Sequence, residues 1–196
     1  IVALRMHHYT CFWSGYRQQL SSTPAAVLSA WDKTIPHYGN LLGMVAFGLE
    51  ELGLYSLAER YGREATAQNP NDLWAVHAVA HVMEMQQRSK DGIRWLNYTL
   101  DHFRDFNPFR GHIWWHKGLF LIDAGLFDAA LSLYDDAIHD TESAFFLDIQ
   151  NSVSFLARLE FNGVNIGQRW EELAEVAQEN SDGHARVFTD LHHIIA

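Results

Sequence analysis

Residues 111–137 read GHIWWHKGLFLIDAGLFDAALSLYDDA, and their spacing decides the fold. Counted from Gly111 as position 1, aromatic and small residues fall at positions 4, 8, 20, 24 and 27, as Trp114, Gly118, Ala130, Tyr134 and Ala137. Small side chains at such positions let two antiparallel helices approach closely. The stretch therefore predicts a helix pair.

The same frame recurs twice upstream, starting at Gly39 and at Leu73. The repeat from Gly39 has small residues at Ala58 and Ala65 and a terminating proline at Pro70. The repeat from Leu73 has small residues at Ala80 and Gly92. A period near 34 residues is typical of tetratricopeptide repeats. We therefore predict an all-α fold, a right-handed α-solenoid of stacked antiparallel helix pairs.

The repeat frame divides the chain into units of one predicted domain, residues 1–196. These units are about 1–38, 39–72, 73–110 and 111–143, then a degenerate pair at 144–182 and a final helix at 184–196. Gly15, Gly53 and Gly125 all fall at position 15, where a left-handed residue would end the first helix of a pair. In the first unit, Ser22 or Thr23 is predicted to cap a helix that opens on Pro24.

The chain is acidic and rich in apolar side chains. Its 196 residues are 48% hydrophobic and 13% aromatic, enough for a sizeable core. Lys and Arg total 14 against 24 Asp and Glu, for a net charge of -10, so nucleic acid and anionic membranes are poor partners. Protonation of the 12 histidines would offset that net charge, which predicts acid sensitivity.

Cys11 is the only cysteine, which excludes an intramolecular disulfide and a thiolate metal cage. No apolar run approaches the roughly 18 residues that a membrane span needs, and no signal peptide is visible. These features favour a soluble, cytoplasmic protein. Because the chain opens on Ile1 inside a predicted helix, it reads as part of a longer protein whose preceding segment could carry a targeting signal.

Two histidine pairs with i, i+4 spacing give the strongest functional signal: His77 with His81, and His112 with His116. This spacing places both rings of a pair on one face of a helix. In the repeat frame they fall on the first helix of each unit, which builds the inner wall of such solenoids. The residues predicted to face one ligand-binding groove are Phe47, Glu50, His77, His81, Glu84, His112, Trp115 and His116, with Glu51, Arg5 and Tyr9 nearby.

Three interpretations of the histidines remain open. They are buried rings that shape the groove, or groups that bind a peptide or small molecule, or ligands of a divalent transition metal. For the metal, His77, His81, His112 and His116 form a sound imidazole set. The HExxH general base of zinc proteases is missing, and no other cofactor is indicated. The other histidines, including His7, His8 and His37, are predicted to lie at the surface or to cap helices.

Other chemistry is sparse. The sequence has no nucleophile elbow, Walker loop or dinucleotide-binding glycine motif. Cys11 lies in an apolar helix without the electropositive setting of a reactive thiolate. Glu50 and Glu84 share position 12 of adjacent repeats, where a desolvated carboxylate beside imidazoles could transfer protons.

Several long blocks resemble the tetratricopeptide repeat protein 38 family. They are WAVHAVAHVMEM at 74–85, HIWWH at 112–116, GLFDAALSLYD at 125–135, YGNLLGMVAFGLEE at 38–51, ALR at 3–5, 65–70, and the closing Phe188, Asp190, Leu191 and His192. The resemblance implies an all-α repeat fold. It also implies a His-rich motif on His77, His81, Glu84, Met85, His112, Trp115 and His116. His7, Tyr9 and Thr189 depart from the family pattern, and the resemblance implies no established reaction.

Two hypotheses of function follow. In the first, the protein is a scaffold that holds a peptide or small molecule in the concave groove, with homodimerisation covering exposed repeat ends. In the second, the same histidines and Glu84 form a metal or acid–base centre of a hydrolase-like enzyme. The first is favoured, because no catalytic motif accompanies the histidines.

Overall fold

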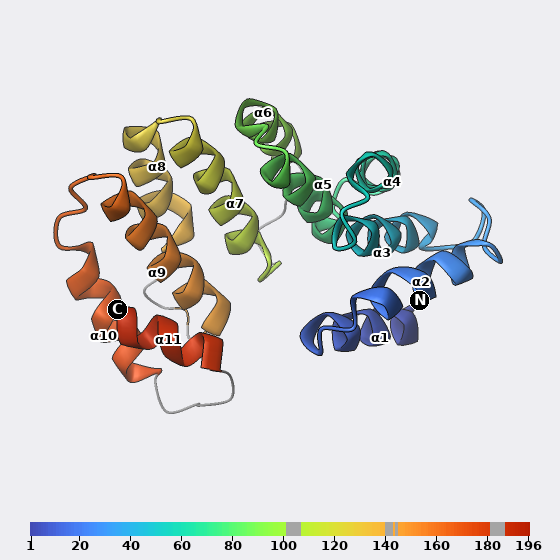
Figure 1. Cartoon of the computed structure of the whole chain (residues 1–196), viewed down its shortest axis with the longest axis horizontal. Helices are drawn as coiled ribbons and strands as arrows, with labels where there is room; N and C mark the ends of the chain where they lie inside the picture. The colour runs from blue at the N-terminus through green and yellow to red at the C-terminus, as the bar shows by residue number, and fades with distance from the viewer. Residues whose placement is uncertain (101–106, 140–142, 144, 181–186) are drawn as a thin grey trace. The chain divides into compact units, whose positions relative to one another are not determined.

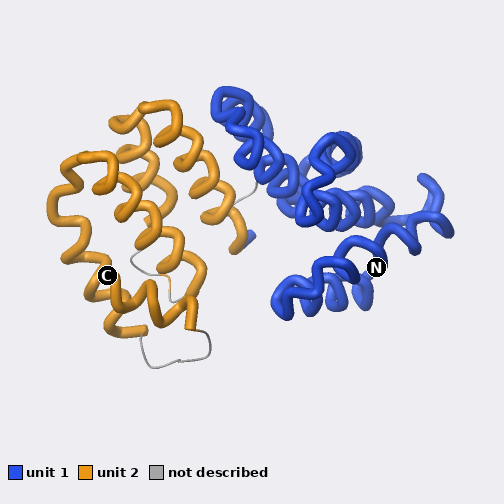
Figure 2. Tube along the Cα trace, in the orientation of Figure 1, with its two compact units in different colours: residues 1–107 blue, residues 108–196 orange. Residues whose placement is uncertain are grey.

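The computed structural model describes residues 1–100, 107–139, 143, 145–180 and 187–196. It divides into two compact units, residues 1–107 and 108–196 (Figure 2). Every element within the described residues is a helix, so the prediction of an all-α fold is confirmed (Figure 1). The assignment of all 196 residues to one domain stays a prediction. None of the helices in the described part combines the length and apolar character needed to span a bilayer.

The first unit consists of three successive helix pairs. Its helices are α1 Val2–Trp13, α2 Arg17–Leu28, α3 Tyr38–Glu50, α4 Tyr55–Gln68, α5 Leu73–Met85 and α6 Ser89–Leu100. Within each pair the connection is a few residues long, which makes consecutive helices antiparallel neighbours (Figure 1). The odd-numbered helices are therefore the first members of the pairs, the class predicted to carry the functional side chains.

Left-handed residues end the first helices, as the repeat frame predicts. Gly15, Gly53 and Gly125 have φ values of +73°, +75° and +71°. The repeat that begins at Leu73 has Gln87 at this position, and Gln87 takes the same conformation with a φ of +57°. The turn is thus kept where glycine is absent, because the helices on either side fix the path of the chain.

Small residues bring the helices of the first unit together. Ala58 and Ala65, at the predicted packing positions of α4, are both 0% exposed. A Cβ added to Gly62 would lie 2.5 Å from a methyl carbon of Val79 on α5, so glycine is required there. These contacts confirm the close approach that the repeat spacing predicts, and they hold α5 firmly against α4.

Asp72 caps α5, the helix that carries His77 and His81. Its Oδ1 accepts hydrogen bonds from the backbone N–H groups of Trp74 (3.1 Å) and Ala75 (3.4 Å), and its Oδ2 accepts one from Asn40 Nδ2 (3.0 Å). These bonds satisfy two of the free donors at the helix start. Burial raises the pKa of the Asp72 carboxyl, and Arg5 and these hydrogen bonds oppose the increase. The cap fixes the orientation of α5 relative to α3.

The prediction of a helix opening on Pro24 is wrong. Helix α2 begins at Arg17 and continues through Pro24 to Leu28, so Ser22 and Thr23 lie within it. A proline inside a helix cannot bond the carbonyl four residues earlier, here that of Leu20. That carbonyl borders Gly48 of α3, whose missing side chain leaves room for it. Close packing of α2 on α3 therefore overrides the local preference of proline for a helix start.

The second unit continues the helical pattern. Its elements are α7 Arg110–Asp123, α8 Phe127–Leu133, the π-helical turn η1 Tyr134–Ile138, α9 Phe146–Phe161, α10 Arg169–Glu179 and α11 Val187–Ile195. Helices α9 to α11 lie in the segments predicted to be helical, and the predicted starts at 144 and 184 fall outside the described residues.

The π-helical turn changes one predicted packing contact. Ala137 was expected to pack at position 27, but Ile138 is the buried residue there, at 2% exposure, and Ala137 is half-buried. The wider turn shifts the register of side chains at the end of the helix. Gly118 of α7 remains tightly packed, because an added Cβ would lie 2.3 Å from Phe155 of α9.

Candidate functional site

Helix α5 presents three aromatic side chains on one face. Trp74, His77 and His81 are three and four residues apart, so their rings follow one another along one face of the helix. The ring centroids are 5.5 Å apart for Trp74 and His77, and 4.1 Å apart for His77 and His81. Phe47 of α3 is stacked on His77 at 5.5 Å and lies 4.5 Å from Trp74. Two adjacent repeats thus build one aromatic layer.

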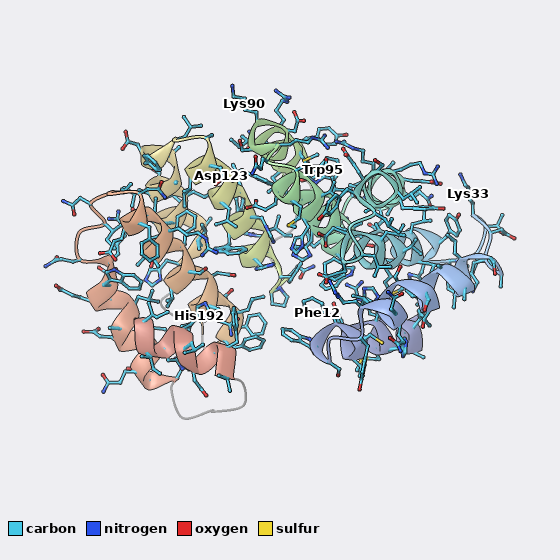
Figure 3. The ribbon with its side chains drawn as sticks, viewed as in Figure 1. Phe12, Lys33, Lys90, Trp95, Asp123 and His192 are labelled. Atoms are coloured by element: carbon cyan, nitrogen blue, oxygen red, sulfur yellow. The ribbon has the colours of Figure 1, made fainter. Side chains whose placement is uncertain are left out.

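Helix α1 completes this layer with a histidine that sequence analysis placed at the surface. His8 is 0% exposed, and its Nε2 accepts a hydrogen bond from Trp74 Nε1 at 3.1 Å. Phe12, labelled in Figure 3, packs edge-on against Phe47 at 5.5 Å. The prediction for His8 is therefore wrong. The spacing of Arg5, His8 and Phe12 on one helical face was the signal that could have identified it.

The charged side chain of Arg5 contacts the same layer. The guanidinium of Arg5 is 4.7 Å from the ring centroid of Tyr9 and 4.7 Å from that of Trp74. Such cation–π contacts hold a charged group over an aromatic face. The predicted position of Arg5 and Tyr9 in the groove stays a prediction.

His8 is held in the neutral form. Burial, followed by the nearby charges of Arg5 and His7, lowers its pKa from 6.5 to about 3, and the Leu20 backbone opposes the decrease. Nδ1 makes no well-aligned hydrogen bond, although the Leu20 carbonyl that Pro24 leaves unbonded borders the ring. Because Nε2 accepts the tryptophan proton, the neutral ring carries its own proton on Nδ1.

The depressed pKa of His8 predicts acid destabilisation. The unfolded chain takes up a proton at His8 below about pH 6.5, whereas the folded state does so only near pH 3. Stability therefore falls as pH decreases through this window, by about 2 kcal/mol at pH 5. In His8→Gln, which keeps an acceptor for Trp74, the loss of unfolding free energy between pH 7 and 5 should shrink by that amount. Urea titrations at each pH measure it. Parallel pH profiles for the two proteins would refute the assignment.

Carboxylates border the imidazoles of the first unit. Glu50 of α3 is 6% exposed, and its Oε2 lies 3.3 Å from Nδ1 of His81, whose side chain is 26% exposed. Glu51 follows directly. The pKa of Glu51 is raised, first by burial and then by the charge of Glu50, while His81 and Arg17 lower it. Glu84, one turn beyond His81, is half-buried.

The second unit holds the other histidine pair in a different environment. His112 Nδ1 lies 3.0 Å from Asn151 Oδ1, and His112 Nε2 lies 3.2 Å from His116 Nε2. With an amide oxygen as acceptor, His112 carries its proton on Nδ1, and Nε2 accepts from the Nε2–H of His116. Trp115 stacks on His112 at 5.2 Å and donates to Ser154 Oγ at 2.9 Å. Helix α9 thus orients His112 and Trp115 directly, and His112 in turn contacts His116.

The predicted site residues fall into two sets. Phe47, Glu50, His77, His81 and Glu84 belong to the first unit, and His112, Trp115 and His116 belong to the second. Within each unit, the two imidazoles of a pair are adjacent, as the i, i+4 spacing predicts. A common site formed by both pairs stays a prediction.

The first unit also has a surface pocket that the sequence did not predict, with a volume of about 400 Å³. Its lining residues are Arg63, Arg88, Asp91, Arg94, Trp95 and Tyr98. Trp95, labelled in Figure 3, donates from Nε1 to the Val76 carbonyl at 3.1 Å. Arg88 is bound to Glu59 at 2.7 Å and to Asp91 at 3.0 Å. Because these carboxylates neutralise much of the arginine charge, the pocket is a poor anion site.

Comparison with known proteins identifies the fold. No protein-family model matches the chain. The structure of MamA residues 41-end from Desulfovibrio magneticus RS-1 is similar, with a TM-score of 0.57 and 15% identity, covering 94% of this chain and 96% of that one. A putative kinesin light chain from Podosopora anserina with nearly identical TPR-like repeats gives a TM-score of 0.61 and 10% identity, covering 92% and 94%. The chain has a tetratricopeptide-like helical repeat fold.

Proposed function

We propose that this protein is a tetratricopeptide-like binding module that holds an extended peptide against the first helices of its repeats. The observation that carries the proposal is the continuous layer built by α1, α3 and α5. In this layer, Trp74 of α5 contacts one side chain of α3 and one of α1. Its ring centroid lies 4.5 Å from that of Phe47, and its Nε1 donates to His8 Nε2 at 3.1 Å. First helices line the inner surface of such repeats, where ligands bind.

Different residues of the site would have different roles in binding. His81 is partly exposed and Trp115 is half-buried, so both can reach a ligand. Phe47 is 0% exposed and His77 is 3% exposed, so they would support the neighbouring rings from below. Arg5 and Glu50 carry opposite charges and would fix the direction of the peptide. A mixed aromatic and charged surface of this kind suits the recognition of an extended segment.

The proposal includes the finer resemblance found in the sequence. We place the chain in the tetratricopeptide repeat protein 38 family, on the strength of its long matching blocks at 38–51, 74–85 and 125–135. A cytoplasmic location and the ability to form homodimers are part of the same proposal. Neither is needed for peptide binding as such.

Selection from a displayed library of random 12-residue peptides tests the binding function. Peptides enriched on the wild-type protein should bind His81→Ala and Trp115→Ala at least about tenfold more weakly, as expected for residues near the centre of an interface. Phe161→Ala is the matched aromatic control, because Phe161 is 91% exposed and lies at the end of α9. Fluorescence anisotropy of the labelled peptides measures each affinity. Equal binding by all four proteins, or a failure to enrich any peptide, would contradict the proposal.

A second candidate function is metal binding by His77, His81, His112 and His116. The observation that favours it is the separation of 3.2 Å between the Nε2 atoms of His112 and His116, which suits two ligands of one ion. Elemental analysis of untagged protein tests this candidate. Stoichiometric metal should be present and should disappear in the His81→Ala, His116→Ala double variant.

A further inference from the structure

We propose that Glu50, Glu51 and His81 bind a divalent transition-metal ion within the first unit. Each residue offers one ligand atom, and these atoms all lie within 4.8 Å of one another. Glu50 and Glu51 stand at the end of α3, and His81 lies on the facing side of α5. This site uses two carboxylates that the four-histidine candidate does not use, and it shares Glu50 and His81 with the proposed peptide-binding surface.

The buried state of Glu50 is the observation that points to a ligand. The residue is 6% exposed, and its Oε2 has no hydrogen-bond partner. Buried carboxylates are normally satisfied by hydrogen bonds or by an ion, because an isolated buried charge is costly. Among the described residues, the ion-pair partner of Glu50 is His81. A cation beside Oε2 would supply the missing interaction.

The geometry between Glu50 and His81 fits two ligands of one ion. Oε2 and Nδ1 are 3.3 Å apart, yet their alignment does not form a hydrogen bond. Zinc bonds to oxygen and nitrogen are about 2.0–2.1 Å, so two ligands at a tetrahedral angle stand about 3.3–3.4 Å apart. Lone pairs that converge on a shared ion do not point at each other. The observed separation and the poor alignment are both consistent with this arrangement.

His81 is held in place for such a role. Its ring centroid lies 4.1 Å from that of His77 and 5.7 Å from that of Phe47, both at steep angles. Aromatic neighbours on two sides restrict rotation of the imidazole and keep Nδ1 facing Glu50. Binding requires Nδ1 to be unprotonated, which places the ring proton on Nε2.

The charges of the three residues select the class of ion. Two carboxylates and one neutral imidazole carry a charge that a divalent cation neutralises. Mixed oxygen and nitrogen ligands suit zinc, manganese or iron(II) better than the all-oxygen preference of calcium or magnesium. Three protein ligands would leave further coordination positions open.

Zinc titration of the full untagged chain tests the site. After removal of metal with a chelator, calorimetry in the presence of a competing weak chelator should detect one tight equivalent of Zn²⁺. Glu50→Gln and Glu51→Gln should each weaken it by at least about tenfold. Glu160→Gln, which changes an exposed carboxylate of α9, is the matched control and should bind as the wild type does.

Thermal unfolding gives a second measurement that separates ligation from folding. In chelator, Glu50→Gln should be at least as stable as the wild type, because it removes a buried charge and keeps the size of the side chain. Added Zn²⁺ should raise the melting temperature of the wild type and leave that of Glu50→Gln unchanged.

Three results would overturn the proposal. One is the absence of tight zinc binding by the wild type, and another is unchanged binding by both carboxylate variants. The third is binding that is lost in His112→Ala and kept in Glu50→Gln and Glu51→Gln, which would assign the metal to the four histidines instead. Failure to select a peptide would count against the binding module alone, so the two proposals fail separately.

Discussion

Replacing Trp74 with alanine is expected to lower the free energy of unfolding by about 4 kcal/mol, as large aromatic truncations in cores do. Trp74 is 5% exposed. Its ring centroid lies 4.5 Å from that of Phe47, 5.2 Å from that of Tyr9 and 6.2 Å from that of Phe12. The substitution also removes the indole N–H that donates to His8 and the aromatic ring that the guanidinium of Arg5 contacts. Urea denaturation followed by far-ultraviolet circular dichroism measures the loss.

Trp74→Phe is the control that separates packing from hydrogen bonding. It keeps an aromatic ring against Phe47 but leaves the buried Nε2 of His8 without its donor. An unsatisfied buried acceptor costs about 1–3 kcal/mol, so the loss should be clearly smaller than for alanine. If Trp74→Ala costs less than about 1 kcal/mol, Trp74 does not join α1, α3 and α5, and the layer on which the binding proposal depends is wrong.

Gly48→Ala is expected to cost about 3 kcal/mol, although alanine is the better helix former. A Cβ at this position would lie 2.6 Å from Ser21 Cα and 2.8 Å from the Leu20 oxygen, both backbone atoms of α2. Backbone atoms cannot rotate away as a flexible side chain can, so α2 and α3 would have to separate. The free energy of unfolding from urea denaturation measures the cost.

Gly39→Ala, in the same helix, is the matched control. Its added Cβ would meet Gln68 Cβ at 3.3 Å and no backbone atom closer than 3.5 Å. The gain in helix propensity offsets this mild contact, so its stability should stay within about 1 kcal/mol of the wild type. Equal effects of the two substitutions would show that α2 does not pack on α3 through Gly48.

Much of the fold could be predicted from the sequence because the same pattern of small residues and helix-ending glycines recurs in several repeats. The 34-residue frame located Gly15, Gly53 and Gly125, each of which ends a helix in the left-handed conformation. It also located Ala58 and Ala65, which are fully buried between helices. Gln87 shows that the frame constrains the backbone even where the typical residue is missing.

The candidate site could be predicted in part. The spacing of each histidine pair requires adjacent rings on one helix, and the repeat frame brings Phe47 and Glu50 of α3 to His77 and His81 of α5. The frame did not predict that Asn151 and Ser154 orient the residues of α7, because these partners come from the degenerate repeat. Periodicity is too weak there to place individual side chains.

Sequence by itself determined the helix pairs and the face on which each histidine pair stands, because periodicity governs residues that share a helix. Only the tertiary structure decided the burial and the pKa of His8. The residues next to it in the sequence predicted a surface position. Gly48 lets α2 pack closely on α3, and Trp74 comes from 66 residues away to donate a hydrogen bond to the ring of His8. Burial and pKa depend on such contacts between distant segments, which no local spacing encodes.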